Sequence, residues 1–310
     1  MVVITLADRS SRFIMSGKTN TNASKLIKAM NELNLEHQKI QPEGLFGSKA
    51  KVIFADKIIS SDELDIEFSI PFDDDLIANE AEITIYNLST STINKLKKGT
   101  KLSVEAGYQK DTGVIFSGFV DKVTTKYEGA DKATVIKCFD DVTKKTVESI
   151  TYKANTKASQ ILKALLDKTG IPIAVFKVRR DWTYKDEQTV EGDLMENIKT
   201  FAEVCGISVF VSKGKIYART LKEGDNINFI INESTGLLGS PEYFEEEVTA
   251  EDYKEIVRGY KIRSLLQHRM TTAAIINLSS REVNGKYRVR SGTHTFNESE
   301  AITEVEVISI

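Results

Sequence analysis

Apolar and polar residues alternate with a period of two along two long stretches of this 310-residue chain, and this alternation restricts the fold more than any other feature. In 82–88, Ile83 and Ile85 share one face, while Thr84 and Tyr86 share the other. Such alternation is typical of β-strands that bury one face. Six strands at this spacing between residues 48 and 140 predict a small antiparallel barrel, closed or nearly closed. The predicted strands are KVIFADKII, LDIEFSIPF, AEITIYNLS, KLSVEAGYQ, GVIFSGFVDKVTTKYEG and KATVIKCFD.

The same alternation returns in residues 225–310 and predicts a second barrel. Asn284-Gly285, between apolar strands, predicts a tight type I′ hairpin turn with positive φ. A weak internal repeat accompanies the two stretches. The segments ITIYNL (83–88), 101–107 and GVIFSG (113–118) resemble YKIRSL (260–265), AIINLSS (274–280) and GKYRVRSG (285–292) in the same order.

Between the two β stretches the pattern changes to helical spacing. A helix is predicted through about 156–169 and a second through about 193–205, ended by Gly170 and Gly206, with a hairpin over 207–220. Each predicted helix carries one apolar stripe. The stripes are Ala158, Ile161, Leu162, Leu165 and Leu166 in the first helix, and Leu194, Ile198, Phe201, Ala202 and Cys205 in the second.

The predicted fold class is therefore mainly β (α+β), with two small antiparallel β-barrel domains and an α+β insert between them. The expected domains are an N-terminal extension (1–47), a first barrel (48–149), the insert (150–224) and a second barrel (225–310). A short amphipathic helix is expected in the extension, with apolar residues at Leu26, Ile27, Met30 and Leu33.

Charge and hydropathy disfavour several functional classes. The formal net charge is −3 and the pI is near 5.8, whereas a duplex-binding domain is usually basic. No run approaches the roughly 18–20 apolar residues that span a bilayer, and no secretory signal is visible. Cys138 and Cys205 lie far apart, so we expect no disulfide framework, a reducing compartment, and small core residues at both positions.

No residue pattern indicates catalysis. We expect no catalytic, cofactor-binding or metal-binding residues, because no nucleophile, phosphate-loop or metal-ligand motif occurs. Asp73–Asp75 is interpreted as a solvated turn, Glu245–Glu247 as an exposed loop or strand edge, and His294 as a partly buried sheet histidine. His37 and His268 lie on polar segments and indicate no site. The one basic cluster, interpreted as a solvated or salt-bridging rim, is Lys95, Lys97, Lys98 and Lys101.

Two blocks of sequence resemble a known family. AEITIYNLSTSTINKLKKGTKLSVEAGY (81–108) with IFSGFVDKV (115–123) resembles the first barrel of the tail hub proteins of contractile phage tails and phage-tail-like bacteriocins. GLLGSPE (236–242), YKIRSLL (260–266) and NGKYRVRSGTH (284–294) resemble the second barrel of that family. The chain departs from the family at HRMTTAA (268–274), where many relatives carry a glycine-containing turn.

This resemblance implies a structural hub and not an enzyme. It implies a homotrimeric ring that adapts the six-fold tail tube of a contractile injection machine to a three-fold spike or tip, in a virion tail or baseplate assembled in the bacterial cytoplasm. The implied partners are tail tube, spike or tail-tip, tape measure and other baseplate proteins, with no specific nucleic-acid binding and no membrane insertion. The alternative is a tail-associated protein that binds or hydrolyses peptidoglycan through the insert, where Trp182 lies near Tyr184.

Overall fold

The computed structural model describes residues 2–3, 14–15, 47–76, 78–109, 111–140, 146–250 and 253–310. The chain divides into two units, Met1–Gln41 and Pro42–Ile310. In the first unit, β1 (Val2–Val3) pairs antiparallel with β2 (Ile14–Met15). The helix predicted around Leu26, and His37, lie outside the described residues.

The second unit begins with a first strand set, β3 to β9. Its elements are β3 (Ser48–Phe54), β4 (Lys57–Ser60), β5 (Ile66–Phe72), β6 (Glu80–Tyr86), α2 (Thr90–Ile93), β7 (Lys101–Tyr108), β8 (Asp111–Glu128) and β9 (Asp131–Phe139). The strands lie in the order β5-β6-β9-β8-β7-β3-β4, and every neighbouring pair is antiparallel. The segment KVIFADKII, predicted as one strand, instead folds as the β3–β4 hairpin, because Ala55 takes a left-handed backbone (φ 49°).

A second strand set, β15 to β20, follows later in the chain. Its elements are β15 (Asp225–Ile231), the 3₁₀ turn η1 (Glu233–Thr235), β16 (Leu237–Ala250), β17 (Tyr253–Leu265), β18 (Ala274–Ser279), β19 (Asn284–Phe296) and β20 (Ala301–Ser309). They lie in the order β16-β17-β20-β19-β18-β15. This order matches β5-β6-β9-β8-β7-β3 strand for strand, and only the last pair differs, since β15 and β18 are parallel. The segments of the internal repeat occupy corresponding places, as β6, β7 and β8 in one set and β17, β18 and β19 in the other.

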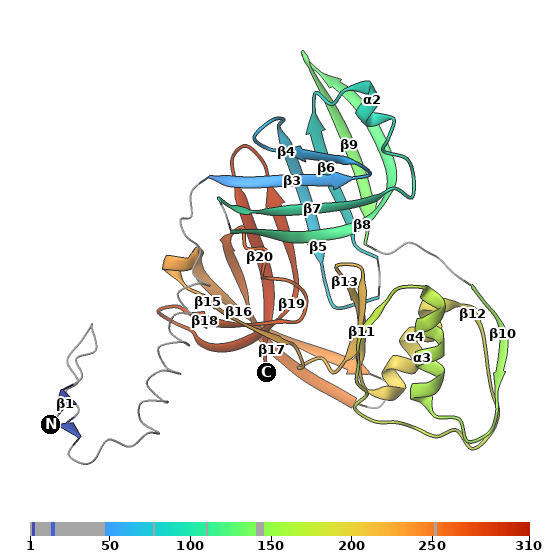
Figure 1. The fold of residues 1–310 in the computed structure, drawn as a ribbon. Helices are drawn as coiled ribbons and strands as arrows, with labels where there is room; N and C mark the ends of the chain where they lie inside the picture. Colours follow the sequence, from blue (N-terminus) through green and yellow to red (C-terminus); the bar gives the residue numbers. More distant parts are fainter. Residues whose placement is uncertain are drawn as a thin grey trace. The chain divides into compact units, whose positions relative to one another are not determined.

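The two strand sets form one continuous sheet, because β19 pairs antiparallel with β5 (Figure 1). Residues Gly292–Phe296 lie opposite Phe72–Phe68 in this junction. The described strands of this sheet number 13, and the fold is mainly β with predominantly antiparallel pairing, as predicted. Among the described strands, no pairing joins β4 to β5 or β15 to β16, so hydrogen bonds do not close either set into a barrel.

Residues 146–219 form an insert between the two strand sets. It contains β10 (Thr146–Tyr152), α3 (Ala158–Thr169), β11 (Ile173–Phe176), β12 (Gln188–Asp193), α4 (Leu194–Cys205), β13 (Ser208–Ser212) and β14 (Lys215–Arg219). Both predicted apolar stripes are the buried faces of α3 and α4. Gly170 (φ 75°) and Gly206 (φ 66°) end the helices in the left-handed conformation, which glycine adopts without steric cost.

Separate hydrophobic cores accompany the first strand set and the insert. One cluster contains inward side chains of β3 to β9 and also Leu266, Phe296 and Ala301 from the second strand set. The other contains the helix stripes with Val147, Val190, Ile207, Val209, Ile216 and Ala218. The second strand set buries its own inward side chains, among them Ile262, Ile276, Val289 and Val307. None of the helices in the described part of the chain has the length and apolarity to cross a membrane.

The turn predicted at Asn284-Gly285 lies elsewhere. Both residues belong to β19, where Asn284 is opposite Ser279 and Gly285 is opposite Leu278. β18 and β19 do form a hairpin, but its turn centres on Arg281 and Glu282. Ser280 stabilises the turn at this earlier position, because its Oγ accepts hydrogen bonds from the backbone N–H groups of Glu282 (3.3 Å) and Val283 (2.9 Å).

Candidate interaction surfaces

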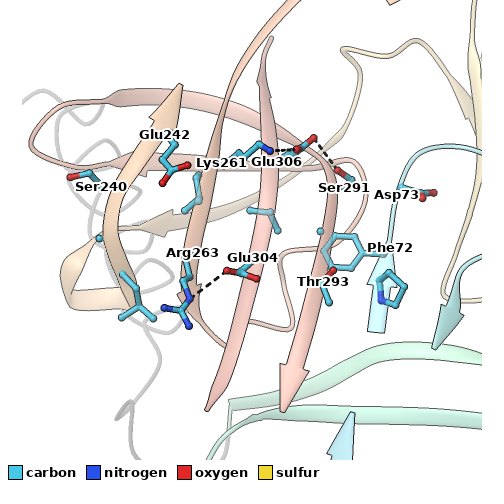
Figure 2. Close-up of a pocket in the computed structure, with 16 residues that line it drawn as sticks. Phe72, Asp73, Ser240, Glu242, Lys261, Arg263, Ser291, Thr293, Glu304 and Glu306 are labelled. Atoms are coloured by element: carbon cyan, nitrogen blue, oxygen red, sulfur yellow. Dashed lines mark hydrogen bonds and ion pairs between the residues drawn. The ribbon is translucent and has the colours of Figure 1, made fainter. Parts of the chain in front are cut away.

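A polar groove of about 770 Å³ crosses the solvent-facing side of the joined sheet (Figure 2). Side chains of β17, β20 and β19 form its floor, since alternate residues of neighbouring strands share a face. Residues 238–242 of β16 and 71–73 at the end of β5 form its walls. The floor residues are Lys261, Arg263, Ser291, Thr293, Glu304 and Glu306.

Opposite charges on the groove floor lie next to each other. The Nζ atom of Lys261 is 3.2 Å from Glu306, and the Nε atom of Arg263 is 3.5 Å from Glu304. Arg263 also donates to Glu300 at 2.8 Å. These charges neutralise each other in pairs, so the groove has a polar floor of mixed charge.

Asp74 forms a buried ion pair at the base of the insert. Its carboxylate accepts a 2.6 Å hydrogen bond from Nη1 of Arg288, whose side chain has no exposed surface. The Nε–H of Arg288 donates to the carbonyl of Glu223 (2.9 Å), and the ring of Phe210 lies 5.9 Å from the guanidinium. Burial lowers the pKa of Arg288, while the charge of Asp74 opposes that shift.

The interpretation of Asp73–Asp75 as a solvated turn is therefore wrong for Asp74, whose side chain is only 10% exposed. The neighbouring Asp73 is partly buried as well. Burial, followed by the nearby charge of Asp75, raises the pKa of Asp73 to about 6. The sequence carries no local sign of this environment, because the partner Arg288 lies in another strand set.

A second ionic cluster joins the two strand sets. Arg269 donates to both carboxylate oxygens of Asp111, each at 2.7 Å, and Nε2 of His268 lies 3.1 Å from Oδ1. Burial alone would raise the pKa of Asp111, but the hydrogen bonds from His268 and Arg269 hold it well below the usual range. The nearby hydroxyl of Tyr108 donates to the carbonyl of Ala301 at 2.9 Å. The sequence alone indicated no role for His268. In the structure the HRMTTAA segment supplies both His268 and Arg269 to this cluster.

His294 is a core histidine, and it is fully buried where partial burial was expected. Its Nδ1 lies 2.8 Å from Oγ1 of Thr303, and the ring of Phe72 lies 4.8 Å away. Burial lowers the pKa of His294 to about 3, so it is neutral at physiological pH. Cys138 and Cys205 are fully buried core residues as predicted, and burial raises their pKa values to about 12 and about 11.

The charged surface segments behave largely as predicted. Lys95 pairs with Asp56 at 2.6 Å, and Lys98 pairs with Asp121 at 2.7 Å, which makes this part of the basic cluster a salt-bridging rim. The Glu245–Glu247 run is exposed on β16, the last strand of the joined sheet. Within the described ranges, no group of three His, Cys, Asp or Glu residues is placed to hold a metal ion.

Large apolar side chains are exposed at a few positions. Tyr127 on β8 is 78% exposed, and Tyr243 and Ile256 on the β16–β17 hairpin are 58% and 51% exposed. Trp182, in the insert, is 61% exposed. Exposed apolar residues that cluster at strand edges are typical of interaction surfaces.

Sequence comparison assigns no family. A family model described as the Alg8 N-terminal domain matches residues 75–225, which is less than half of the chain. No curated protein matches the sequence.

Three solved structures with a similar fold are two tail proteins and a type VI secretion component. A tail protein from Neisseria meningitidis has a TM-score of 0.59 at 9% identity, over 85% of this chain and 97% of its own. The 43 kDa tail protein of prophage MuSo2 from Shewanella oneidensis has a TM-score of 0.56 at 9% identity, over 84% and 97%. An Escherichia coli protein has a TM-score of 0.57 at 10% identity, over 84% and 77%. It is described as a component of the type VI secretion system with structural similarity to the T4 bacteriophage tail proteins gp27 and gp5.

These three similarities cover most of the chain at 9–10% identity, so they establish the fold but not the function of this chain. The tail proteins and this chain share the mainly β architecture that the strand sets and insert form. The described chain therefore has the fold of phage tail proteins and of the type VI secretion component similar to them.

Proposed function

We propose that this protein is a structural component of a phage tail or tail-like injection machine. In this proposal it is a homotrimeric baseplate hub that adapts the six-fold tail tube to a three-fold spike or tip. Its partners are tail tube, spike or tail-tip, tape measure and other baseplate proteins. The hub works in the virion tail, after assembly in the bacterial cytoplasm, and it catalyses no reaction.

The repeated strand order is the observation that carries this proposal. One chain contains β5-β6-β9-β8-β7-β3 and, with the same order, β16-β17-β20-β19-β18-β15. A chain with two similar halves presents two similar surfaces, so three copies present six. Such a ring matches six-fold symmetry on one side and three-fold symmetry on the other. The tail-protein fold supports the same assignment. We also propose that the chain divides into an N-terminal extension (1–47), a first barrel domain (48–149), an insert domain (150–224) and a second barrel domain (225–310).

Light scattering on the purified chain, alone and with its tail-tube partner, tests the proposal. We expect a species of three chains, and electron microscopy of that species should place both strand sets at similar radius. A stable dimer, or a ring in which the two sets lie at different radii, would contradict the proposed hub.

A second candidate function is peptidoglycan binding through the insert, favoured by the 61% exposure of Trp182. An exposed indole is a suitable stacking surface for a sugar ring. An assay with purified cell walls distinguishes peptidoglycan binding from peptidoglycan hydrolysis. Sedimentation of the chain with the walls, lost in Trp182→Ala, supports binding, and clearing of the wall suspension supports hydrolysis. Neither result is expected from a hub that only assembles with tail proteins.

A further inference from the structure

We infer that neighbouring copies of this chain join edge to edge, with β8 of one copy antiparallel to β16 of the next, so that Tyr127 lies opposite Glu245 and diagonal to Tyr243. The inference rests on the proposed ring and names its contact between copies. It follows from the open strand edges, from the junction already present within the chain, and from the exposed aromatic side chains.

Both strands have an open edge. The first part of β8 pairs with β7 through Asp111–Phe119, and the later part pairs with β9 through Phe119–Glu128. Within the described part of the chain, no strand pairs with the other side of residues 121–128. β16 ends the joined sheet and pairs with β17 alone among the described strands. Unpaired strand edges are ready to pair with another strand.

The junction between β19 and β5 is an internal template for this contact. In the repeated strand order, β19 corresponds to β8 and β5 corresponds to β16. β19 pairs with β18 through Asn284–Arg288, and its later residues Gly292–Phe296 pair with β5. The corresponding later part of β8 is the part with the open edge. An antiparallel β16 from a second copy would fill the place that β5 fills on β19.

The internal repeat also fixes the register. Ile83 of β6 corresponds to Tyr260 of β17 in the alignment of ITIYNL with YKIRSL. Phe68 lies opposite Ile83, and Tyr243 lies opposite Tyr260, so Tyr243 corresponds to Phe68. Phe68 stacks on Phe296 across the internal junction, with ring centroids 5.3 Å apart.

Tyr127 is the side chain on β8 that matches His294. Because Ile83 corresponds to Tyr260, their partners Ile136 and Val307 also correspond, and so do Lys132 and Thr303, four residues earlier on the same strands. Tyr127 is opposite Lys132, and His294 is opposite Thr303. His294 is opposite Ile70 at the internal junction, and Ile70 corresponds to Glu245, so Tyr127 lies opposite Glu245 of the next copy and diagonal to Tyr243.

Alternation of Tyr127 with Val123, which is opposite the buried Ile136, places Tyr127 on the core side of the sheet. Tyr243 is on the core side as well, since it is opposite Tyr260 and Tyr260 is opposite the buried Val307. A contact between Tyr127 and Tyr243 would bury two aromatic side chains that are exposed in the single chain.

Disulfide cross-linking tests the register. Residues directly opposite each other in antiparallel strands have Cα atoms about 4.5–5.5 Å apart, within the range that a disulfide bridges. Tyr127→Cys with Glu245→Cys should give, on mild oxidation, a covalent closed trimer that reductant converts to single chains. Both native cysteines are fully buried and do not interfere. The matched control is Ser69→Cys with Thr295→Cys, a directly opposite pair at the internal junction, which should give only an intrachain disulfide.

A charge substitution provides a second readout. Tyr243→Lys should abolish the trimer in light scattering while the circular dichroism spectrum of the chain stays that of the folded wild type, because more than half of the side chain is exposed. Trp182→Lys, equally exposed but away from both edges, should leave the trimer intact.

The outcomes separate this inference from the proposed function. A trimer that forms without cross-linking at this pair, and that survives Tyr243→Lys, overturns the β8–β16 contact but not the hub. A disulfide-linked dimer of the single Tyr127→Cys variant indicates a symmetric contact and also overturns it. A chain that stays monomeric with its tail-tube partner and forms no cross-link overturns both.

Discussion

At the scale of single residues, Asp74 and Arg288 form the most deeply buried ion pair within the residues that the structure describes. The guanidinium of Arg288 has no exposed surface, so its charge depends on Asp74 for compensation. Replacing the pair with apolar residues could leave stability unchanged, but removing one partner leaves a charge uncompensated in a low-dielectric interior.

Asp74→Asn should therefore lower the free energy of unfolding by about 3–5 kcal/mol. Urea unfolding followed by circular dichroism measures this change. Glu233→Gln is the matched control, because Glu233 pairs with Arg281 on the surface, where both side chains are mostly exposed. Its unfolding midpoint should match the wild type, and equal midpoints for both variants would contradict the role of Asp74.

Asp73 should make the chain less stable as the pH rises. Its pKa is about 6 in the folded chain and about 3.8 in the unfolded chain, so the folded chain binds the proton more tightly between these values. Stability should fall as the pH increases from about 4 to about 6 and stay lower above that range. Asp73→Asn should remove this loss and raise the free energy of unfolding at pH 8 by about 1–2 kcal/mol, with little gain at pH 4. A variant with an unchanged pH profile would show that Asp73 is not the group responsible.

At the scale of elements, local sequence determines helices and strands well and turn positions less well. The apolar stripes of α3 and α4 match the predicted residues because a 3.6-residue period leaves only one face to bury. The hairpin turn before β19 differs from the Asn-Gly prediction because the hydroxyl of Ser280 stabilises an earlier turn.

Ser280→Ala should accordingly destabilise the β18–β19 hairpin by about 1 kcal/mol, since two backbone N–H groups lose their acceptor. Thermal unfolding measures the loss. The exposed neighbour Ser279 provides the control, and Ser279→Ala should leave the midpoint unchanged. If Ser280→Ala unfolds like the control, the hydroxyl does not hold the turn.

At the scale of the whole molecule, Asp111 connects the two strand sets through His268 and Arg269. Its carboxyl pKa is lowered on folding, so the pair stabilises the fold above the unfolded pKa near 3.8 and loses that contribution as the pH falls through the folded value. The connection is therefore present at neutral pH and lost in acid.

Asp111→Asn should cost about 2–3 kcal/mol at pH 7 and should flatten the decline in stability below about pH 4. Unfolding measured from pH 2 to pH 7 tests both parts. Asp62→Asn, which removes the exposed pair with Lys49, should change neither the stability at pH 7 nor the shape of the acid decline. An Asp111→Asn profile parallel to the wild type would refute the assignment.

The sequence by itself determined the strands, the helix faces, the fold class and the resemblance to tail proteins, because each depends on periodicity or on contiguous residues. Its internal repeat also indicated the two similar strand sets. Only the tertiary structure decided which charges are buried. Asp74 resembles any acidic turn residue until folding places Arg288 against it, and His268 gains its role only when Asp111 approaches from the other strand set. The open edges of β8 and β16 likewise depend on which strands are neighbours, since a strand's own residues do not specify what pairs with each of its sides.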